Sequence, residues 1–207
     1  MKIIVFGATG GTGSNIVRQA LEAGHDVTAV ARNPFAITLK HPQLEIVHGD
    51  VLASESLVPI ISRHDAVVSA LGANLREPTI LYSIGITNIL NAMKEIDVRR
   101  LLCISAGGLD PGPLLQRLIA KPLLWWVFKN GYTDMARMEA LLQDEGLNWT
   151  ILRAPRLTDN PRMGKYHTAV NTHLSSGWSL SRADLADYLV VHLNDPTTYR
   201  AIVEIAY

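Results

Sequence analysis

A glycine-rich turn near the amino terminus constrains the fold more than any other feature of the sequence. An apolar run over residues 2–6 leads directly into Gly7-Ala8-Thr9-Gly10-Gly11-Thr12-Gly13, and helical spacing begins at Ser14. This order predicts a buried strand, a tight turn and the start of a helix. The unpaired amides and the partial positive charge of a helix N-terminus suit a pyrophosphate. The segment therefore predicts a dinucleotide-binding site, because a strand before the glycines and a helix after them are the context that the motif requires.

The three glycines at the G-x-x-G-x-x-G spacing have different expected roles. Gly7 permits the tight turn, and Gly10 lets the backbone approach the phosphates. Gly13 allows the helix to pack closely against the strand.

The rest of the chain alternates short apolar runs with segments of helical spacing. This alternation predicts a parallel sheet covered by helices on both faces, which is a Rossmann-like, doubly wound α/β fold. We expect one domain over residues 1–207, because a chain of this length can bury a sizeable core without dividing. The expected strands after the first cover residues 26–31, 44–48, 65–70, 100–104, 148–153 and 201–205.

Two segments depart from this alternation, at about residues 106–132 and 155–182, and we interpret both as substrate-side elements. Within the first, the apolar stretch 114–132 suits a packed helix pair, a pocket wall or lid, or a dimer face. A helix is expected from Thr133 to Glu145. The second segment should contain a polar loop with Tyr166, His167 and His173, before a helix capped by Ser181 and Asp184.

Several residues follow the predicted strands and so fall at the edge of the sheet where ligands bind in open α/β folds. Arg32 follows the second strand without a neighbouring carboxylate, and an arginine there suits the 2′-phosphate of NADP, although it could simply be solvated. Asp50 could bind the adenine amino group or merely form a turn. Gly72 would let a cofactor ribose approach the backbone. Ser105 could bind a ligand or form a turn.

Composition narrows the classes of partner. Lys plus Arg and Asp plus Glu both number 19, so the net charge of zero does not favour nucleic acid or an anionic membrane. The longest run of the most apolar stretch, residues 123–128, is far too short to span a bilayer. The chain begins with a strand rather than a cleavable signal, so we expect a cytoplasmic protein. We expect no metal site, and either a monomer or a dimer.

Five segments of the chain resemble the atypical short-chain dehydrogenase/reductase family. Within it, the similarity is greatest to the NAD(P)H-binding group that includes NmrA-like proteins and the small biliverdin reductase B/flavin reductases. The resemblance covers nearly the whole chain and is specific in its cofactor half. The segments are the glycine run 7–13, Val47-His48-Gly49-Asp50-Val51, Ile104-Ser105-Ala106, residues 146–155 and residues 181–186.

The resemblance implies an NADP(H) site and assigns residues to it. The glycine run would line the pyrophosphate, Arg32 the 2′-phosphate, Asp50 and Val51 the adenine, and Leu71 with Gly72 the ribose. Ser105 would lie near the nicotinamide, with Pro155 from the sixth strand. The implied cofactor-binding residues are Gly7, Thr9, Gly10, Gly11, Thr12, Gly13, Arg32, Asp50, Val51, Leu71, Gly72, Ser105 and Pro155.

The chain departs from the family pattern where the family places its proton donor. Typical members carry Tyr-x-x-x-Lys, in which the lysine lowers the pKa of the tyrosine. Here Tyr132 is followed four residues later by Ala136 and five later by Arg137. Arg137 stays protonated and could position an anion without acting as an acid. The biliverdin/flavin reductases place a histidine after the proline of the sixth strand, where this chain has Arg156.

Two functions fit these observations. The first is an NADPH-dependent oxidoreductase that transfers hydride to a small carbonyl, quinone or flavin-like acceptor, with Ser105 and Tyr132 as candidate catalytic residues. Ser105 would donate a hydrogen bond to the acceptor oxygen. The alternative is an NADP(H)-binding redox sensor or regulator without turnover, which the incomplete Tyr-x-x-x-Lys motif favours. A nucleotide-sugar epimerase relative fits less well, because the chain has no room for the usual substrate domain.

Overall fold

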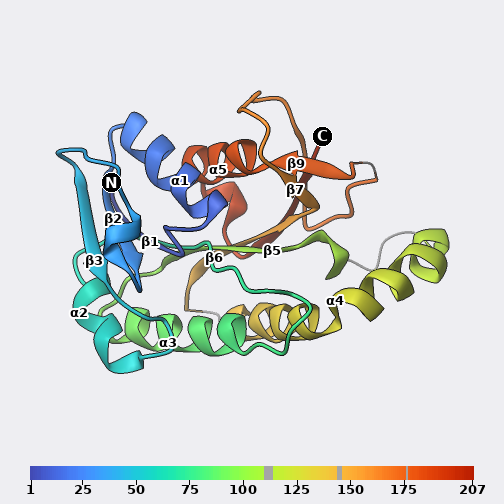
Figure 1. Ribbon diagram of the computed structural model, residues 1–207, viewed down its shortest axis with the longest axis horizontal. Coiled ribbons are helices and arrows are strands. Elements are labelled where there is room, and N and C mark those ends of the chain that lie inside the picture. Colours follow the sequence, from blue (N-terminus) through green and yellow to red (C-terminus); the bar gives the residue numbers. More distant parts are fainter. Residues whose placement is uncertain (110–113, 144–145, 176) are drawn as a thin grey trace.

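The computed structural model describes residues 1–109, 114–143, 146–175 and 177–207, and these form three layers with a sheet between two sets of helices (Figure 1). Within these residues the main sheet has eight strands in the order β3-β2-β1-β4-β5-β6-β10-β8. The strands are β1 (Lys2–Phe6), β2 (Asp26–Ala31), β3 (Leu44–His48), β4 (Ala66–Ser69), β5 (Arg100–Ala106), β6 (Asn148–Ala154), β8 (His167–Val170) and β10 (Ala201–Ala206). Strands β7 (Arg156–Thr158) and β9 (Ser179–Ser181) form a separate parallel pair.

The predicted doubly wound fold is confirmed. Strands β1 to β6 and β10 pair in parallel, and their order reverses between β1 and β4. In open α/β sheets ligands bind outside the carboxyl ends of the strands at this reversal point. The topology therefore places the end of β1, with its glycine turn, at the expected position of a ligand crevice.

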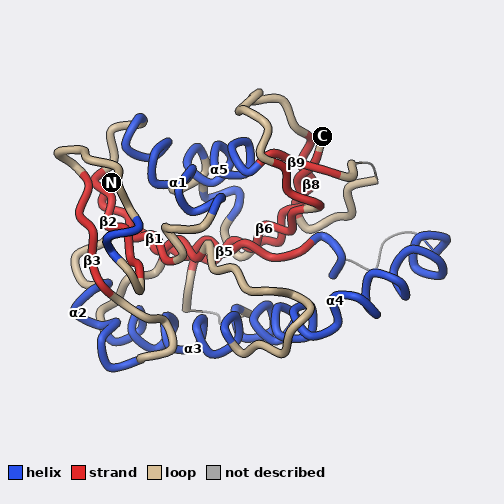
Figure 2. The backbone as a smooth tube through the Cα atoms, in the orientation of Figure 1, coloured by secondary structure: helices blue, strands red, loops and turns tan. Residues whose placement is uncertain are grey.

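Helices cover both faces of the sheet, as Figures 1 and 2 show. The helices α1 and α5 pack on one face, and α2, α3 and α4 on the other. Alternate strand residues supply the two cores, with Ile3 and Val5 facing α1 and α5, and Ile4 and Phe6 facing the other layer. The helices are α1 (Gly11–Glu22), α2 (Leu57–Ile61), α3 (Leu81–Glu95), α4 (Leu114–Leu142) and α5 (Arg182–Val191).

Two expectations about secondary structure were wrong. The segment expected as a polar loop contains β8, which pairs antiparallel with β10 at the edge of the sheet. Its sequence, His167-Thr168-Ala169-Val170, is too short and too polar to indicate a strand without the partner strand. The helix expected to begin at Thr133 instead continues from Leu114, and the non-helical angles of Phe128 mark a kink within it.

The kink in α4 adjoins a close contact with the loop after β4. The Gly131 amide donates to the Leu75 carbonyl at 3.1 Å, and a Cβ atom on Gly131 would lie 2.5 Å from Leu75 Cδ2. Glycine normally weakens a helix, but here it lets the loop approach the helix backbone. The part of α4 before the kink extends past the edge of the sheet (Figure 1), and Trp126 within it is 81% exposed.

Asp134 fixes α4 against α3. Its buried carboxylate accepts hydrogen bonds from the Tyr82 amide at 2.9 Å and from the Ser83 hydroxyl, and so caps the first turn of α3 from another helix. Among the described residues, no helix has the length and apolarity needed to cross a bilayer.

Candidate dinucleotide and substrate site

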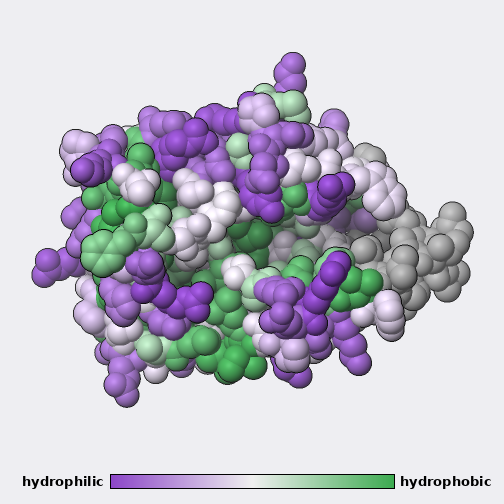
Figure 3. Space-filling model, viewed as in Figure 1, coloured by the Kyte–Doolittle hydropathy of each residue, from purple (hydrophilic) through white to green (hydrophobic). Residues whose placement is uncertain are grey.

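A cavity of about 1180 Å³ opens at the carboxyl ends of the parallel strands. Figure 3 shows the corresponding hollow in the middle of the face, with hydrophobic surface in its depth, and with hydrophilic and hydrophobic residues both present around it. Of the residues predicted to bind cofactor or to act in catalysis, all but Gly13 line this cavity. They are Gly7, Thr9, Gly10, Gly11, Thr12, Arg32, Asp50, Val51, Leu71, Gly72, Ser105, Tyr132 and Pro155.

The glycine turn has the geometry that its sequence predicts. Gly7 has a φ of +77°, which side-chain-bearing residues rarely adopt, and its carbonyl accepts the Gly10 amide at 3.0 Å. Gly13 does not line the cavity because it packs behind the turn. A Cβ atom on Gly13 would lie 2.1 Å from the Gly7 carbonyl oxygen, so this glycine allows the close approach of helix and strand.

The first turn of α1 presents an uncapped helix N-terminus to the cavity. Gly10 occupies the N-cap position without a side-chain hydrogen bond, and the first turn contains no acidic residue. The first amides of a helix lack intrahelical partners, and the helix dipole gives them a partial positive charge. Gly10, Gly11 and Thr12 line the cavity at this point, so the turn suits a diphosphate.

The adenine side of the cavity combines an exposed arginine with a turn-forming aspartate. Arg32 is exposed at the end of β2, where a ligand phosphate could reach its guanidinium. Asp50 Oδ1 accepts the Leu52 amide at 3.0 Å, so the turn-forming role considered for Asp50 is present. The half-buried carboxylate still lines the cavity, and the turn fixes its position.

Gly72 leaves open space next to the backbone after β4. A Cβ atom built on it would have no atom within 4 Å beyond Gly72 and its two neighbours in the chain, and the residue lines the cavity. The next amide, that of Ala73, donates to the Tyr82 hydroxyl at 2.9 Å, which fixes this loop against α3. The backbone at Gly72 is therefore open for a ribose, as the sequence predicts, while its surroundings are held.

A buried polar cluster around Glu139 of α4 lies next to the other end of the cavity, where Ser105 and Arg153 line the wall. The Ser105 hydroxyl donates to Glu139 Oε1 at 2.6 Å. Arg153 donates to both carboxylate oxygens, through Nε at 3.1 Å and through Nη2 at 2.6 Å. Ser105 is 2% exposed and Glu139 is 7% exposed, so these charge-assisted bonds lie away from bulk water. The Ser105 hydroxyl thus uses its one hydrogen in the bond to Glu139, and the lone pairs of the Ser105 oxygen stay available to a ligand.

The register of the sheet extends this cluster across three strands. Ser105 of β5 is in register with Arg153 of β6, and Arg153 with Glu204 of β10. Registered residues on parallel neighbours point to the same face. Glu204 Oε2 lies 3.2 Å from His173 Nδ1 and accepts the Leu174 amide at 2.8 Å. Ser105, Arg153, Glu204 and His173 all line the cavity.

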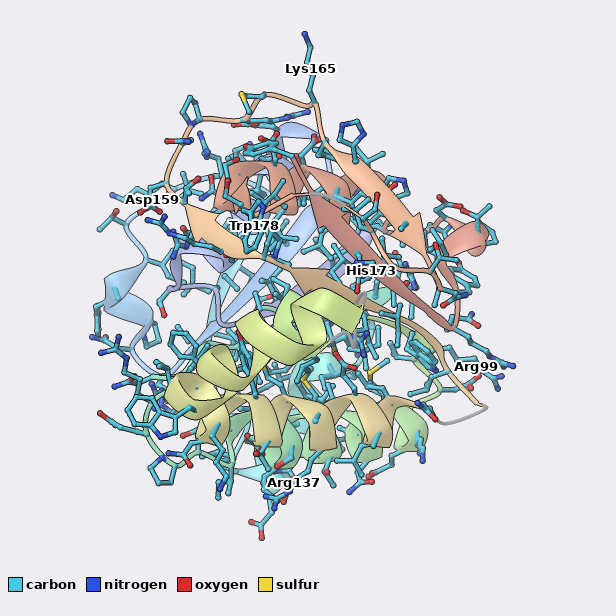
Figure 4. All side chains as sticks on the ribbon, turned by 90° about the vertical axis from the view of Figure 1, so that its right-hand side faces the viewer. Arg99, Arg137, Asp159, Lys165, His173 and Trp178 are labelled. Carbon is cyan, nitrogen blue, oxygen red and sulfur yellow. The ribbon has the colours of Figure 1, made fainter. Side chains whose placement is uncertain are left out.

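Aromatic side chains enclose this end. The Tyr132 ring lies 5.8 Å from the Phe128 ring between centroids, and both line the cavity. Burial raises the pKa of Tyr132, so its phenol is protonated at neutral pH. Figure 4 shows Trp178 and His173 on the strand side of α4, while Arg137 points away from the opposite side. Arg137 is exposed and does not line the cavity, so it is not placed to position an anion there.

Sequence reasoning missed Glu139 and Glu204, and gave no role in the site to Arg153 or His173. A carboxylate in the pattern of a helix or strand normally indicates a solvated surface residue. The four residues also come from four separate segments, so no local pattern links them. Arg153 did carry a signal, because an arginine at the end of an otherwise apolar strand needs a buried partner. The identity of that partner depends on how α4 crosses the sheet.

This fold, with its glycine turn and crevice, defines a Rossmann-type dinucleotide-binding protein. A family model described as NAD(P)H-binding matches residues 7–196, and the chain belongs to that family.

Several known proteins are similar to this chain over nearly its whole length. The uncharacterized protein YwnB of Bacillus subtilis (strain 168) is 28% identical, covering 94% of this chain and 92% of that protein. "Reductase pytE" of Aspergillus terreus is 23% identical, covering 92% and 90%. A short-chain dehydrogenase/reductase of Veillonella parvula DSM 2008, solved in complex with NADP, shares the fold with a TM-score of 0.79 at 18% identity, covering 100% of this chain and 94% of that one.

Proposed function

We propose that the protein is an NADPH-dependent reductase that transfers hydride to a small carbonyl, quinone or flavin-like acceptor. The proposal rests on one observation. The glycine turn lines the same continuous cavity as Ser105, Arg153 and Tyr132. Its volume of about 1180 Å³ accommodates a dinucleotide together with a small second molecule. The reductase named among the relatives supports the same reaction class.

The residues at the two ends of the cavity have different expected functions, one end binding the cofactor and the other the acceptor. The bound nicotinamide supplies the hydride when the cofactor is present. The acceptor oxygen then needs a proton, and Tyr132 can donate a hydrogen bond to it because the phenol stays protonated. While the Ser105 hydroxyl donates to Glu139, its oxygen can accept a hydrogen bond from a ligand N–H. Ser105 can donate to the acceptor oxygen only if its hydrogen bond to Glu139 is broken.

The choice of NADPH over NADH rests on Arg32. It is exposed at the cavity edge after β2, where the discriminating residue of this fold is found. A guanidinium binds a 2′-phosphate through paired hydrogen bonds and opposite charge.

The test is NADPH oxidation by the purified protein with a panel of quinones, aldehydes and free flavins, followed by the loss of NADPH absorbance. We expect turnover with at least one acceptor, and Ser105→Ala should lower kcat. The matched control is Ser69→Ala, since Ser69 is also buried near the end of a parallel strand but does not line the cavity. Equal kcat values for Ser105→Ala and wild type would show that Ser105 has no catalytic role.

Two observations favour a second function, that of an NADP(H)-binding regulator without turnover. The Ser105 proton is held by Glu139, and position 136 is Ala rather than the Lys that activates the tyrosine in this family. Tight NADPH binding without oxidation by any acceptor of the panel would favour this function over the reductase.

A further inference from the structure

Arg182, the first residue of α5, lies directly against the glycine turn. A Cβ atom built on Gly11 would be 2.8 Å from Arg182 Cδ and 3.1 Å from its Nε. Both residues line the main cavity, together with Thr9, Gly10 and Thr12. The arginine side chain therefore passes over the turn whose amides suit a diphosphate.

The backbone that carries Arg182 is held by several hydrogen bonds. The Ser181 hydroxyl accepts the Asp184 amide at 2.9 Å, which confirms the predicted helix cap. Asp184 also accepts the amides of Met163 and Gly164, at 2.9 and 2.7 Å. These bonds fix the first turn of α5 relative to the loop before it.

A further bond ties α5 to α1. Gln19 Nε2 of α1 donates to the Ala183 carbonyl at 2.8 Å in a buried position. Arg182 is therefore attached to the same helix whose N-terminus forms the glycine turn. Its side chain starts from a point that is fixed with respect to the diphosphate position.

The guanidinium itself has a weak partner. Its Nη1 donates to Asp159 Oδ1 at 2.7 Å, but the Asp159 side chain is 88% exposed and the Arg182 side chain 31% exposed. An exposed ion pair of this kind contributes little free energy. Arginine has five N–H donors, and Asp159 is the one partner of this guanidinium within the described ranges. A more strongly charged ligand could displace it or share the arginine with it.

We propose that Arg182 binds the diphosphate of the dinucleotide, an inference that rests on the dinucleotide binding of the proposed function. The glycine turn supplies amide dipoles but no full positive charge, whereas a diphosphate carries two negative charges. Arg182 adds that charge from α5, far away in the sequence. Its role differs from that of Arg32, because the diphosphate is common to NADPH and NADH and the 2′-phosphate is not.

The test compares the binding of NADPH and NADH by calorimetry in wild type and Arg182→Gln. We expect Arg182→Gln to weaken both dinucleotides by the same factor, about ten- to a hundredfold, as for a lost hydrogen bond to a charged group. The affinity for NADPH should also fall less steeply with added salt in this variant, because one ionic contact is gone. The dinucleotide affinities of Arg182→Lys should lie between those of wild type and Arg182→Gln, because lysine keeps the positive charge but lacks the planar guanidinium.

Two further variants separate direct contact from structural effects. Arg162→Gln is the matched control, because Arg162 also pairs with an aspartate, Asp187, at 2.6 Å but does not line the main cavity. Its dinucleotide affinities should equal those of wild type. Asp159→Asn keeps the guanidinium and removes its competing carboxylate, so NADPH binding should be unchanged or tighter.

Each outcome decides the proposal. Unchanged affinities in Arg182→Gln would overturn it and leave the reductase proposal intact. A loss in Asp159→Asn as large as in Arg182→Gln would also overturn it, because the ion pair would then be a structural clamp. A wild-type protein that binds neither dinucleotide would overturn both proposals. Tight binding with an equal loss in Arg182→Gln, but no turnover, would support Arg182 and reject the reductase.

Discussion

The two ends of the cavity are built in different ways. At the cofactor end, thirteen consecutive residues form a strand, a turn and a helix start, and their backbone makes the site. At the other end, a polar cluster assembles residues from five segments of the chain, namely the buried Ser105, Glu139 and Glu204, the partly buried Arg153 and the exposed His173. The first end depends on the absence of side chains at a few positions. The second depends on charged side chains of opposite sign that stabilise one another in positions with little access to water.

The difference predicts different responses to mutation. A side chain added at Gly7 or Gly13 meets backbone, which cannot move aside, so both folding and binding should fail. Removing one charge from the cluster takes a charge-assisted hydrogen bond from its partner in a site of low water access, which destabilises the fold without closing the cofactor end.

Gly13→Val should have the largest effect. A Cβ atom at this position would lie 2.1 Å from the Gly7 carbonyl oxygen, so we expect the free energy of unfolding to fall by about 4 kcal/mol or more, with loss of NADPH binding. Urea denaturation and NADPH titration measure the two effects. The matched control is Gly72→Ala, where a Cβ atom has open space and stability should stay within about 0.5 kcal/mol of wild type. Equal destabilisation by the two variants would contradict this account of the turn.

Glu139→Ala should cost about 3 kcal/mol, because the partly buried Arg153 would lose both charge-assisted hydrogen bonds to this carboxylate. Urea denaturation of this variant, of Arg153→Met and of the double variant gives the coupling free energy. We expect the double variant to be more stable than the sum of the single losses predicts. Additive losses would mean that the two residues contribute separately.

Asp184→Asn should cost about 2 kcal/mol at pH 7. Burial raises the pKa of Asp184, but hydrogen bonds from Tyr207, Gly164, Met163 and Ser181 together lower it more, so the net pKa lies below the ordinary value. The ionised carboxylate therefore stabilises the fold above the unfolded pKa, and this contribution is lost as the pH falls through the lower folded pKa.

The measurement for Asp184 is the free energy of unfolding as a function of pH. The difference between wild type and Asp184→Asn should be constant near neutral pH and should shrink below about pH 4. Asp97→Asn serves as control, because Asp97 forms an exposed pair with Arg99 and should have an effect within about 0.5 kcal/mol. A difference that does not depend on pH would show that the charge of Asp184 is not what stabilises the fold.

Arg32→Ala should have the smallest effect. We expect NADPH affinity to fall about tenfold while NADH affinity changes little, since the 2′-phosphate distinguishes the two. Calorimetric titration with both cofactors measures this, and Arg137→Ala is the control because Arg137 points away from the cavity (Figure 4). An equal loss for both cofactors would rule out the 2′-phosphate role of Arg32.

The sequence predicted most of the fold because its signals are local. Apolar runs, helical spacing and the glycine spacing each act over a few residues, and they gave the strands β1 to β6 and the position of the glycine turn. Expectations failed where a partner decides the outcome. β8 exists through its pairing with β10, and α4 runs through Gly131 where the loop at Leu75 packs against it.

The sequence by itself determined that the carboxyl end of β1 meets a helix N-terminus without side chains in the way, since glycine spacing is a property of adjacent residues. The tertiary structure alone decided what surrounds that turn. It placed Arg182 over Gly11 and buried Glu139 between Ser105 and Arg153. The physical reason is that a charged side chain becomes stable in a buried position through partners that lie far away in the chain, and the packing of helices on the sheet chooses those partners.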